Sequence, residues 1–328
     1  MYQKRIWISW ETQRRSIELS NKLNCKLFII ELHGLLRYPL SILKTILILL
    51  KENPSIFFVQ NPSMVLALIA CFYGKLVKIP LIIDRHTTFL LDKYTIQHWN
   101  RRVFLFLSRY TIRNALITIV TNEGLIDLVK QSQGNPFVLP DPLPDISPIK
   151  KKSFSTFSRM NLLVPSSFGF DEPVFAILNA SKSLSNNGIF FYITGDDRRF
   201  QKKFKLKIPD NVQLTGFLPL QDYVDLLFSV DGVMVLTTAS FCMLCGCYEA
   251  ITAEKPLITS DKPALKNYFY DALFVDNSAE NIARACIEML NNIDLYKEKS
   301  KKMKATISKQ WDLKLLDLEE SLLHLKKN

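Results

Sequence analysis

The segment 236–261 combines hydroxyl side chains, a glycine and a carboxylate at helical spacing. A hydrophobic strand is predicted to end there in a loop rich in Thr and Ser, and a helix is predicted to begin around Gly246 with Glu249 in its first turns. Backbone N–H groups and hydroxyls at the start of a helix can hold a phosphate, and a carboxylate one turn later can accept two hydrogen bonds from a ribose diol. The alternative is that Glu249 only complements the helix dipole. This segment alone supports both interpretations equally.

Three ionisable residues follow a predicted strand in the first half of the chain. The strand 81–84 ends in Asp84 and runs directly into Arg85 and His86. Ligands of α/β proteins bind at the carboxyl ends of strands, so a substrate hydroxyl is expected to approach there. Either Asp84 or His86 could remove a proton from such a hydroxyl. The alternative is that Asp84 caps the following turn and His86 makes only local contacts.

A second charged loop, residues 10–16, follows the first predicted strand. Arg14 and Arg15 lie near the start of a predicted helix, and Glu11 belongs to the same loop. A guanidinium binds pyrophosphate or a carboxylate with two parallel hydrogen bonds, so this loop is a candidate site for an anionic acceptor. The alternative is a solvated, charged helix face.

These residues must be positioned by an alternation of strands and helices that runs through most of the chain. Short β-branched or aromatic runs alternate with longer segments of helical period, which is typical of parallel sheets covered by helices. One helix is predicted from Ser41, as its N-cap, to Glu52, and the tail 311–325 is strongly helical. Strands are predicted at 5–9, 26–31, 56–60, 81–84, 115–121, 137–139, 161–165, 190–193, 212–214, 233–236, 257–259 and 272–275.

The alternation breaks over residues 140–158, where four prolines exclude a central strand or a helix. We therefore predict an N-terminal domain over 1–150 and a second domain from 151. The expected fold class is α/β, with two Rossmann-like, doubly wound parallel sheets in tandem. Such sheets face each other across a cleft lined by the carboxyl ends of their strands, and function is expected there.

Composition limits the classes of protein. The 328 residues are 48% hydrophobic and 22% charged, which allows a large core and excludes a disordered chain. Residues 1–150 hold 19 Lys and Arg against 10 Asp and Glu, whereas residues 151–328 hold 23 against 21. The first half is therefore expected to have an anionic partner. No nucleic-acid-binding module is recognised, and neither a signal peptide nor a membrane-spanning segment is predicted.

The six cysteines do not form a disulfide framework, which is typical of a cytoplasmic protein. Cys242, Cys245 and Cys247 are spaced like metal ligands, but no second cluster of Cys or His accompanies them. We therefore predict no metal site.

The order and spacing of the motifs at 209–217, 223–232 and 248–261 resemble the nucleotide-sugar domain of GT-B glycosyltransferases of the family 4 type (glycosyl transferases group 1). The resemblance covers roughly residues 161–291, and the alternating first half is compatible with the acceptor domain of the same fold. It implies a nucleotide-sugar domain over 151–305 and a C-terminal helix over 306–328 that crosses back to the first domain.

The resemblance also implies site residues. Glu249 would hold the ribose of a nucleoside diphosphate sugar, with Gly246 and Tyr248 beside it, and the loop from Thr237 to Leu244 would face the diphosphate and the transferred sugar. The full set of implied donor contacts is Glu249, Gly246, Tyr248, Thr237, Thr238, Ser240, Met243, Leu244, Ser166, Ser167 and Gly195. The predicted acceptor contacts are Glu11, Arg14, Arg15 and Arg85, and no metal or other cofactor is expected.

Two positions depart from the family pattern. The usual pair of glutamates has seven residues between its members, and the first glutamate is replaced here by Phe241. Ser166 and Ser167 stand where a basic pair usually meets the phosphates. These departures leave the donor sugar and the stereochemistry open, and they keep a catalytically silent GT-B partner subunit as an alternative.

The resulting expectation is a glycosyltransferase of the hexosyltransferase class that acts in polysaccharide or glycolipid biosynthesis. Its acceptor would be a glycan or lipid-linked, and its basic, apolar first half would rest on the anionic inner face of the membrane. A nucleotide-sugar epimerase of the same fold is a further alternative. A periplasmic binding protein would share the tandem architecture but should carry a signal peptide.

Overall fold

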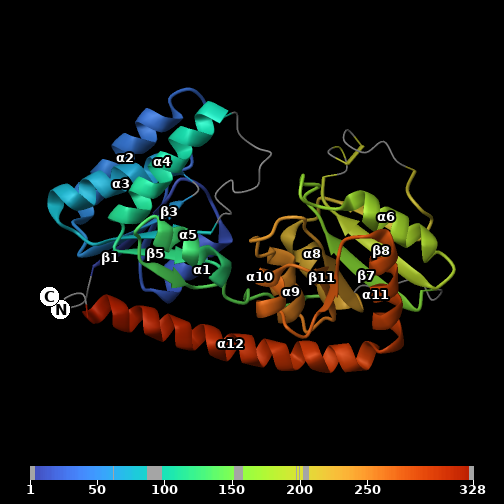
Figure 1. Ribbon diagram of the computed structural model, residues 1–328. Helices are drawn as coiled ribbons and strands as arrows, with labels where there is room; N and C mark the ends of the chain where they lie inside the picture. The colour runs from blue at the N-terminus through green and yellow to red at the C-terminus, as the bar shows by residue number, and fades with distance from the viewer. Residues whose placement is uncertain are drawn as a thin grey trace. The chain divides into compact units, whose positions relative to one another are not determined.

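The computed structural model describes residues 4–61, 63–86, 98–150, 158–196, 198, 200–201 and 207–324. The chain divides into two compact units (Figure 1). Unit 1 comprises Met1–Pro142 and Trp311–Asn328, and unit 2 comprises Leu143–Gln310. The first boundary precedes the predicted residue 150 because Leu143 and Ile146 already pack against the core of unit 2.

Unit 1 contains a six-stranded parallel sheet in the order β2-β1-β3-β4-β5-β6. Its strands are β1 (Arg5–Ser9), β2 (Lys26–Ile29), β3 (Ile56–Asn61), β4 (Leu81–Arg85), β5 (Ile117–Val120) and β6 (Pro136–Val138). The helices are α1 (Arg14–Lys22), α2 (Arg37–Glu52), α3 (Met64–Val77), α4 (His98–Asn114) and α5 (Ile126–Gln131), with a 3-10 turn at Glu123–Leu125.

Both faces of this sheet are covered, as the near-continuous apolar strands require. Phe57 packs against Leu49 of α2 and Leu66 of α3 on one face. Its neighbour Phe58 points to the opposite face and joins Leu19 of α1 in a second core. The alternation along β3 thus separates a layer formed by α2, α3 and α4 from a layer on the other side of the sheet.

Unit 2 repeats the architecture with a parallel sheet in the order β12-β11-β10-β7-β8-β9. Its strands are β7 (Met160–Pro165), β8 (Ile189–Thr194), β9 (Val212–Gly216), β10 (Gly232–Val235), β11 (Leu257–Ser260) and β12 (Leu273–Val275). The helices are α6 (Val174–Ser183), α8 (Leu220–Ser229), α9 (Cys245–Thr252), α10 (Pro263–Tyr268) and α11 (Ala279–Asn291). Leu162 and Leu163 of β7 point into the two cores on opposite faces.

The last helix, α12 (Ile293–His324), belongs to both units. Its final turns complete the second core of unit 1, where Trp311 and Leu318 are buried. The indole Nε1 of Trp311 donates to the carbonyl oxygen of Pro140 at 2.9 Å. Arg5 binds both carboxylate oxygens of Glu319 at 2.6 and 2.7 Å. The helix therefore begins before both predicted starts, 311 for the helical tail and 306 for the C-terminal helix implied by the resemblance. Its end is held to unit 1 by apolar and ionic contacts.

Two local predictions differ from the structure. Ser41 lies inside α2, which begins at Arg37, because its hydroxyl faces the protein core and is 1% exposed rather than capping an end. Helix α10 was not predicted, since it spans only the six residues Pro263–Tyr268. Within the described residues, no helix combines the length and the apolar character needed to cross a membrane.

Candidate functional site

Buried polar side chains gather at the carboxyl ends of the unit 1 strands. Ser9 ends β1, Gln60 lies near the end of β3, and Asp84 lies near the end of β4, all with 2% exposure or less. The register places Gln60 beside Asp84, and the hydroxyl of Ser9 donates to Oε1 of Gln60. Burial of polar groups is costly unless they are hydrogen-bonded, so this edge of the sheet is built around a polar network.

Arg15, in the first turn of α1, binds two carboxylates in this network. Its Nε lies 3.0 Å from each Oδ atom of Asp84, and its Nη2 lies 2.8 Å from Oδ1 of the same residue. Its Nη1 donates to Asp141, and its Nη2 also donates to the carbonyl oxygen of Leu139 at 2.9 Å. The planar guanidinium is suited to such forked contacts and fixes the Asp84 carboxylate in one orientation.

The two charges hold each other ionised. Burial raises the pKa of Asp84, but the charge of Arg15 and the contact with His86 lower it more, and the result is a pKa of about 2. Burial lowers the pKa of Arg15, but the charges of Asp84 and Asp141 raise it above its ordinary value. A carboxylate with so low a pKa is a weak base at neutral pH, so Asp84 is poorly suited to remove a proton from a hydroxyl.

His86 follows β4 and lies beside Asp84. Its Nδ1 is 3.4 Å from Oδ2 of Asp84, and its side chain is 16% exposed, whereas that of Asp84 is fully buried. A carboxylate at one ring nitrogen orients an imidazole and leaves the other nitrogen to accept a proton. Of the two predicted bases, the geometry favours His86 as the base and Asp84 as the group that orients it.

The structure corrects two of the four predicted acceptor contacts. Arg15 is buried and its guanidinium is used within the protein, as described above. Arg85 is 1% exposed and donates to the hydroxyl of Ser108 at 2.7 Å, and burial lowers its pKa. Sequence alone does not distinguish these arginines from exposed ones, because both types follow strands or begin helices.

The other two predicted acceptor residues are partly exposed. The side chain of Arg14 is 31% exposed and lies 3.7 Å from Glu18. Glu11 lines a pocket of about 300 Å³ whose other walls include Trp10, Gln13, Glu31, His33 and Arg37. These residues follow the carboxyl ends of β1 and β2, and that position is the signal by which Gln13, His33 and Arg37 could have been predicted.

In unit 2, the end of β7 is tightly packed against the end of β8. Gly195 has φ +134°, and a Cβ atom there would lie 2.5 Å from the carbonyl oxygen of Ser166 and 2.7 Å from the ring of Phe168. Only glycine fits this position. The predicted donor residues Ser166, Ser167 and Gly195 are thus brought together at one edge of the sheet.

The loop after β10 contains both buried and exposed predicted contacts. Thr237 is fully buried, its hydroxyl donates to Asp171 at 2.6 Å, and its N–H donates to the hydroxyl of Ser260 at 2.8 Å. Its polar atoms therefore shape the loop rather than face a ligand, which corrects its predicted role. Thr238 and Ser240 are exposed at the same edge, and Met243, Leu244 and Phe241 are partly exposed.

Helix α9 places Glu249 where the sequence predicts it. The N-terminus of α9 approaches the sheet closely at Gly246, where a Cβ atom would lie 3.0 Å from Val235. Tyr248 is fully buried against Tyr268 and Phe269, so it packs in the core and does not face a ligand, contrary to its predicted role. Glu249 is partly exposed.

Tyr223 of α8 was not predicted as a functional residue. It belongs to the motif 223–232, but its contact with Glu249 joins residues far apart in the sequence. Its hydroxyl donates to Oε2 of Glu249 at 2.5 Å and so orients the carboxylate. Among the described residues, no group of three or more His, Cys, Asp and Glu side chains comes together as metal ligands would.

The ion pair between Arg15 and Asp84 predicts an acid-sensitive unit 1. The folded pKa of Asp84 is about 2, below its ordinary 3.8, so the stabilisation is complete above about pH 4 and is lost as the pH falls toward 2. We expect a contribution on the order of 2 kcal/mol to the free energy of unfolding. In urea titrations, the difference in stability between the native chain and Asp84→Asn should shrink between pH 5 and pH 2. An unchanged difference over this range would contradict the prediction.

Comparisons with known proteins agree with this architecture. Residues 162–310 match the family model for glycosyl transferases group 1. This match covers nearly all of unit 2, and it confirms the predicted glycosyltransferase class. No curated protein matches the chain by sequence.

Solved structures share the fold over the whole chain. Sucrose-phosphate synthase from Thermosynechococcus elongatus has a TM-score of 0.76 at 12% identity, with 99% of this chain and 100% of that chain covered. HepE from Anabaena, in complex with UDP and glucose, has a TM-score of 0.72 at 12% identity, with 98% and 100% covered. A glycosyltransferase from Rickettsia africae has a TM-score of 0.67 at 15% identity, with 99% and 91% covered. The predicted GT-B fold is confirmed.

Proposed function

We propose that this chain, a glycosyltransferase of the GT-B fold, transfers a sugar from a nucleoside diphosphate sugar to a glycan or lipid-linked acceptor. The observation that carries this proposal is Glu249, a partly exposed carboxylate in the first turns of α9 whose orientation is set by Tyr223. It lies in the matched domain, at the helix that follows the loop after β10. The structure of HepE with UDP-glucose supports the class of donor.

The donor half of the reaction is assigned to unit 2. Glu249 accepts hydrogen bonds from the ribose hydroxyls, and the exposed hydroxyls of Thr238 and Ser240 contact the diphosphate or the sugar. The amide groups at the start of α9 and the positive end of its dipole stabilise the leaving diphosphate, so the proposal requires no metal or other cofactor.

The acceptor half is assigned to unit 1. His86 accepts the proton of the attacking hydroxyl, while Asp84 holds the imidazole and Arg15 holds Asp84. The pocket at the ends of β1 and β2, with Glu11 and Arg37 on its walls, supports binding of a polar acceptor group. This chemistry suits an inverting transfer, in which a base activates the acceptor.

Thermal unfolding with a panel of nucleotides tests the donor assignment. UDP, GDP, CMP and dTDP and their sugar conjugates are added to the native chain, Glu249→Ala and the control Glu280→Ala, which removes an exposed carboxylate of α11. One nucleotide class should stabilise the native chain and the control, by about 2.7 kcal/mol at 100 times the dissociation constant. The effect should be lost in Glu249→Ala. Equal stabilisation of all three proteins, or none with any nucleotide, would contradict the proposal.

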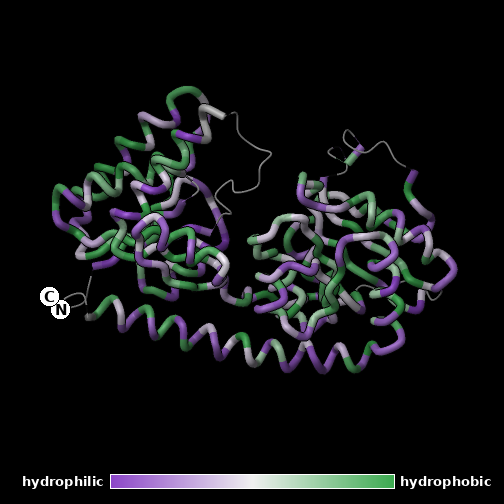
Figure 2. The backbone as a smooth tube through the Cα atoms, in the orientation of Figure 1, coloured by the Kyte–Doolittle hydropathy of each residue, from purple (hydrophilic) through white to green (hydrophobic). Residues whose placement is uncertain are grey.

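The outer face of α2, α3 and α4 supports binding of this chain to an anionic membrane. We call this surface the α2–α4 face. Figure 2 shows hydrophobic residues along these helices. Exposed apolar side chains recur at Leu36, immediately before α2, and within α2 at Leu40, Leu43, Leu47 and Leu50. Leu76 of α3 and Phe106 of α4 are also exposed. An exposed apolar stripe of this extent is typical of a surface that is covered in use.

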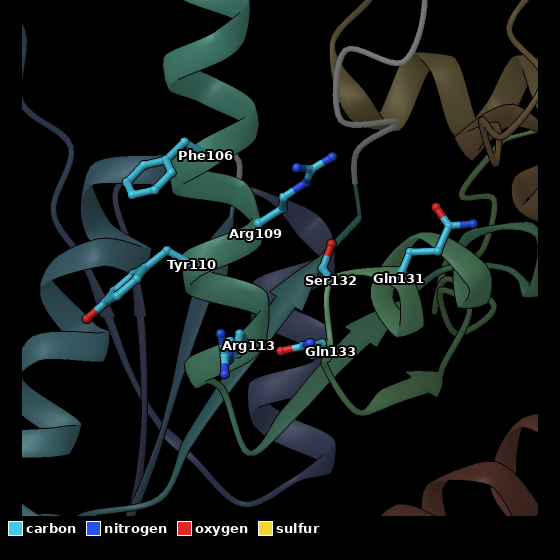
Figure 3. Close-up of a pocket in the computed structure, with 7 residues that line it drawn as sticks. All are labelled: Phe106, Arg109, Tyr110, Arg113, Gln131, Ser132 and Gln133. Atoms are coloured by element: carbon cyan, nitrogen blue, oxygen red, sulfur yellow. The ribbon is translucent and has the colours of Figure 1, made fainter.

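Cations accompany the apolar side chains. Lys44, Lys51 and Lys75 are exposed on α2 and α3. On α4, Arg109 and Arg113 line a hollow of about 320 Å³ beside Ser132 and Gln133 (Figure 3), and neither has a carboxylate partner among the described residues. Basic side chains interleaved with apolar ones suit an anionic lipid surface. These side chains support our proposal that the protein acts at the inner face of the cytoplasmic membrane, on a lipid-linked acceptor in a polysaccharide or glycolipid pathway.

Replacement of one exposed leucine tests the membrane assignment. Leu47→Glu of α2 should weaken binding to phosphatidylglycerol-containing vesicles about tenfold, because an apolar side chain worth about 1.5–3 kcal/mol is replaced by a charge. Leu295→Glu in unit 2 is the matched control, since the two leucines are 55% and 54% exposed. Binding is measured by vesicle sedimentation, with pure phosphatidylcholine vesicles as the neutral reference. Equal binding of all three proteins to the anionic vesicles would contradict the assignment.

A further inference from the structure

The loop between β7 and α6 binds the carboxylate of one of its own residues, Glu172. Oε1 of Glu172 accepts from the N–H and the hydroxyl of Ser167 at 2.9 and 2.6 Å. Oε2 accepts from the N–H of Phe168 at 3.0 Å and from the hydroxyl of Ser166. Two successive backbone N–H groups and two hydroxyls therefore converge on one anion. This set of donors is also the kind that holds a phosphate oxygen.

The loop keeps this shape through its packing. Phe168 has a φ of +53°, a left-handed conformation that is uncommon for an aromatic residue. Its ring is 1% exposed and lies 5.2 Å from the ring of Phe200. Gly195 at the end of β8 leaves room for the loop, as described above. Phe168 is thus anchored in a left-handed conformation, and the successive N–H groups of Ser167 and Phe168 both point to the Glu172 carboxylate, so the anion-binding concavity is preformed.

The concavity belongs to the same edge of the sheet as the proposed donor site. Asp171 accepts from the hydroxyl of Thr237 at 2.6 Å through its side chain and from the N–H of Thr238 at 2.7 Å through its carbonyl oxygen. The segment 165–173 contains no Lys or Arg. An anionic ligand at this loop must therefore be held by amide and hydroxyl donors, and Glu172 occupies four of them.

We propose that the Glu172 carboxylate is an internal competitor for the anionic part of the ligand, and that a phosphoryl group of the donor displaces it. The identity of the ligand rests on the proposed function. Glu172 thereby sets the affinity of the site for nucleoside diphosphates. Its charge excludes weakly bound anions, since a ligand must replace four hydrogen bonds and overcome a neighbouring negative charge.

The competition predicts that removal of the side chain tightens binding. By isothermal titration calorimetry, Glu172→Ala should bind inorganic pyrophosphate and the nucleoside diphosphate selected by the panel at least tenfold more tightly than the native chain. That change corresponds to about 1.4 kcal/mol. Glu172→Gln, which keeps the size of the side chain and removes its charge, should also bind more tightly. Asp196→Ala is the matched control, because Asp196 lies next to Gly195 and is half exposed outside the concavity. Its affinity should change by less than about threefold.

Each other outcome overturns the inference. Weaker binding by both Glu172 variants would make Glu172 a structural clamp of the loop, and an equal gain in Asp196→Ala would make the effect one of net charge. If nucleotides bind in a Glu249-dependent manner while the Glu172 variants show no gain, the inference fails and the proposed function stands. If no protein of the series binds any nucleotide or pyrophosphate, both fail.

Discussion

Arg15→Met is expected to lower the free energy of unfolding of unit 1 by about 3–5 kcal/mol. Removal of one partner from a buried ion pair leaves an uncompensated charge in the protein interior, which is far more costly than loss of the pair as a whole. Here two carboxylates lose their cation. Asp84 is fully buried, and Asp141 has only 13% of its side chain exposed. The apolar side chain of methionine fills a volume similar to that of the arginine side chain. The loss of stability therefore reports mainly on the loss of the charge.

Tryptophan fluorescence during urea unfolding measures this effect selectively. The four tryptophans of the chain, Trp7, Trp10, Trp99 and Trp311, all belong to unit 1. Arg109→Met is the control, because Arg109 is exposed on α4 and should change stability by less than about 0.5 kcal/mol. If the free energy of unfolding of Arg15→Met were within about 1 kcal/mol of that of the native chain, the buried network would contribute little to stability.

His86→Gln is expected to reduce kcat for sugar transfer by about 10²–10⁴, the range over which a positioned general base acts. The KM for the donor should stay within about threefold of its native value, since the donor is assigned to unit 2. Glutamine keeps a hydrogen-bonding side chain of similar length beside Asp84 but does not accept a proton at neutral pH. The measurement is steady-state transfer with the donor identified by the nucleotide panel.

The stability of the variant separates a catalytic role from a structural one. The side chain of His86 is partly exposed, and the residue follows a strand end. The free energy of unfolding of His86→Gln should therefore lie within about 1 kcal/mol of that of the native chain. An unchanged kcat would contradict the assignment of His86 as the base. A rise in donor KM that accounts for the whole loss would place His86 in donor binding instead.

The sequence predicts the fold because the hydrophobic strands and the helical segments between them alternate without ambiguity. Strand β1 has the predicted bounds, and the other strands lie within about two residues of theirs. The position of Asp84 at the end of a strand and that of Glu249 near the start of a helix also follow from the sequence. The sequence does not predict the direction in which a side chain at such a position points. Arg14 and Arg15 are neighbours, yet Arg14 is partly exposed and Arg15 is buried against two carboxylates.

The other incorrect predictions have one physical cause. The placement of each residue depends on contacts with residues distant in the sequence. Tyr248 packs against Tyr268 and Phe269 of α10 and its end, and that helix was itself not predicted. Thr237 is buried because Asp171, more than sixty residues earlier, accepts its hydroxyl. A motif fixes which residue types stand near a ligand, whereas tertiary packing decides which of them reach it.

Release of free nucleoside diphosphate from the selected nucleotide sugar, with and without a membrane lipid extract, tests the central claim most directly. The account predicts release by the native chain that increases with the extract, is abolished in Glu249→Ala and falls at least a hundredfold in His86→Gln. Nucleotide binding that depends on Glu249, with no release under either condition, would contradict the account. In that case the chain would be a silent GT-B subunit, consistent with Phe241 and with the absence of a basic pair at Ser166 and Ser167.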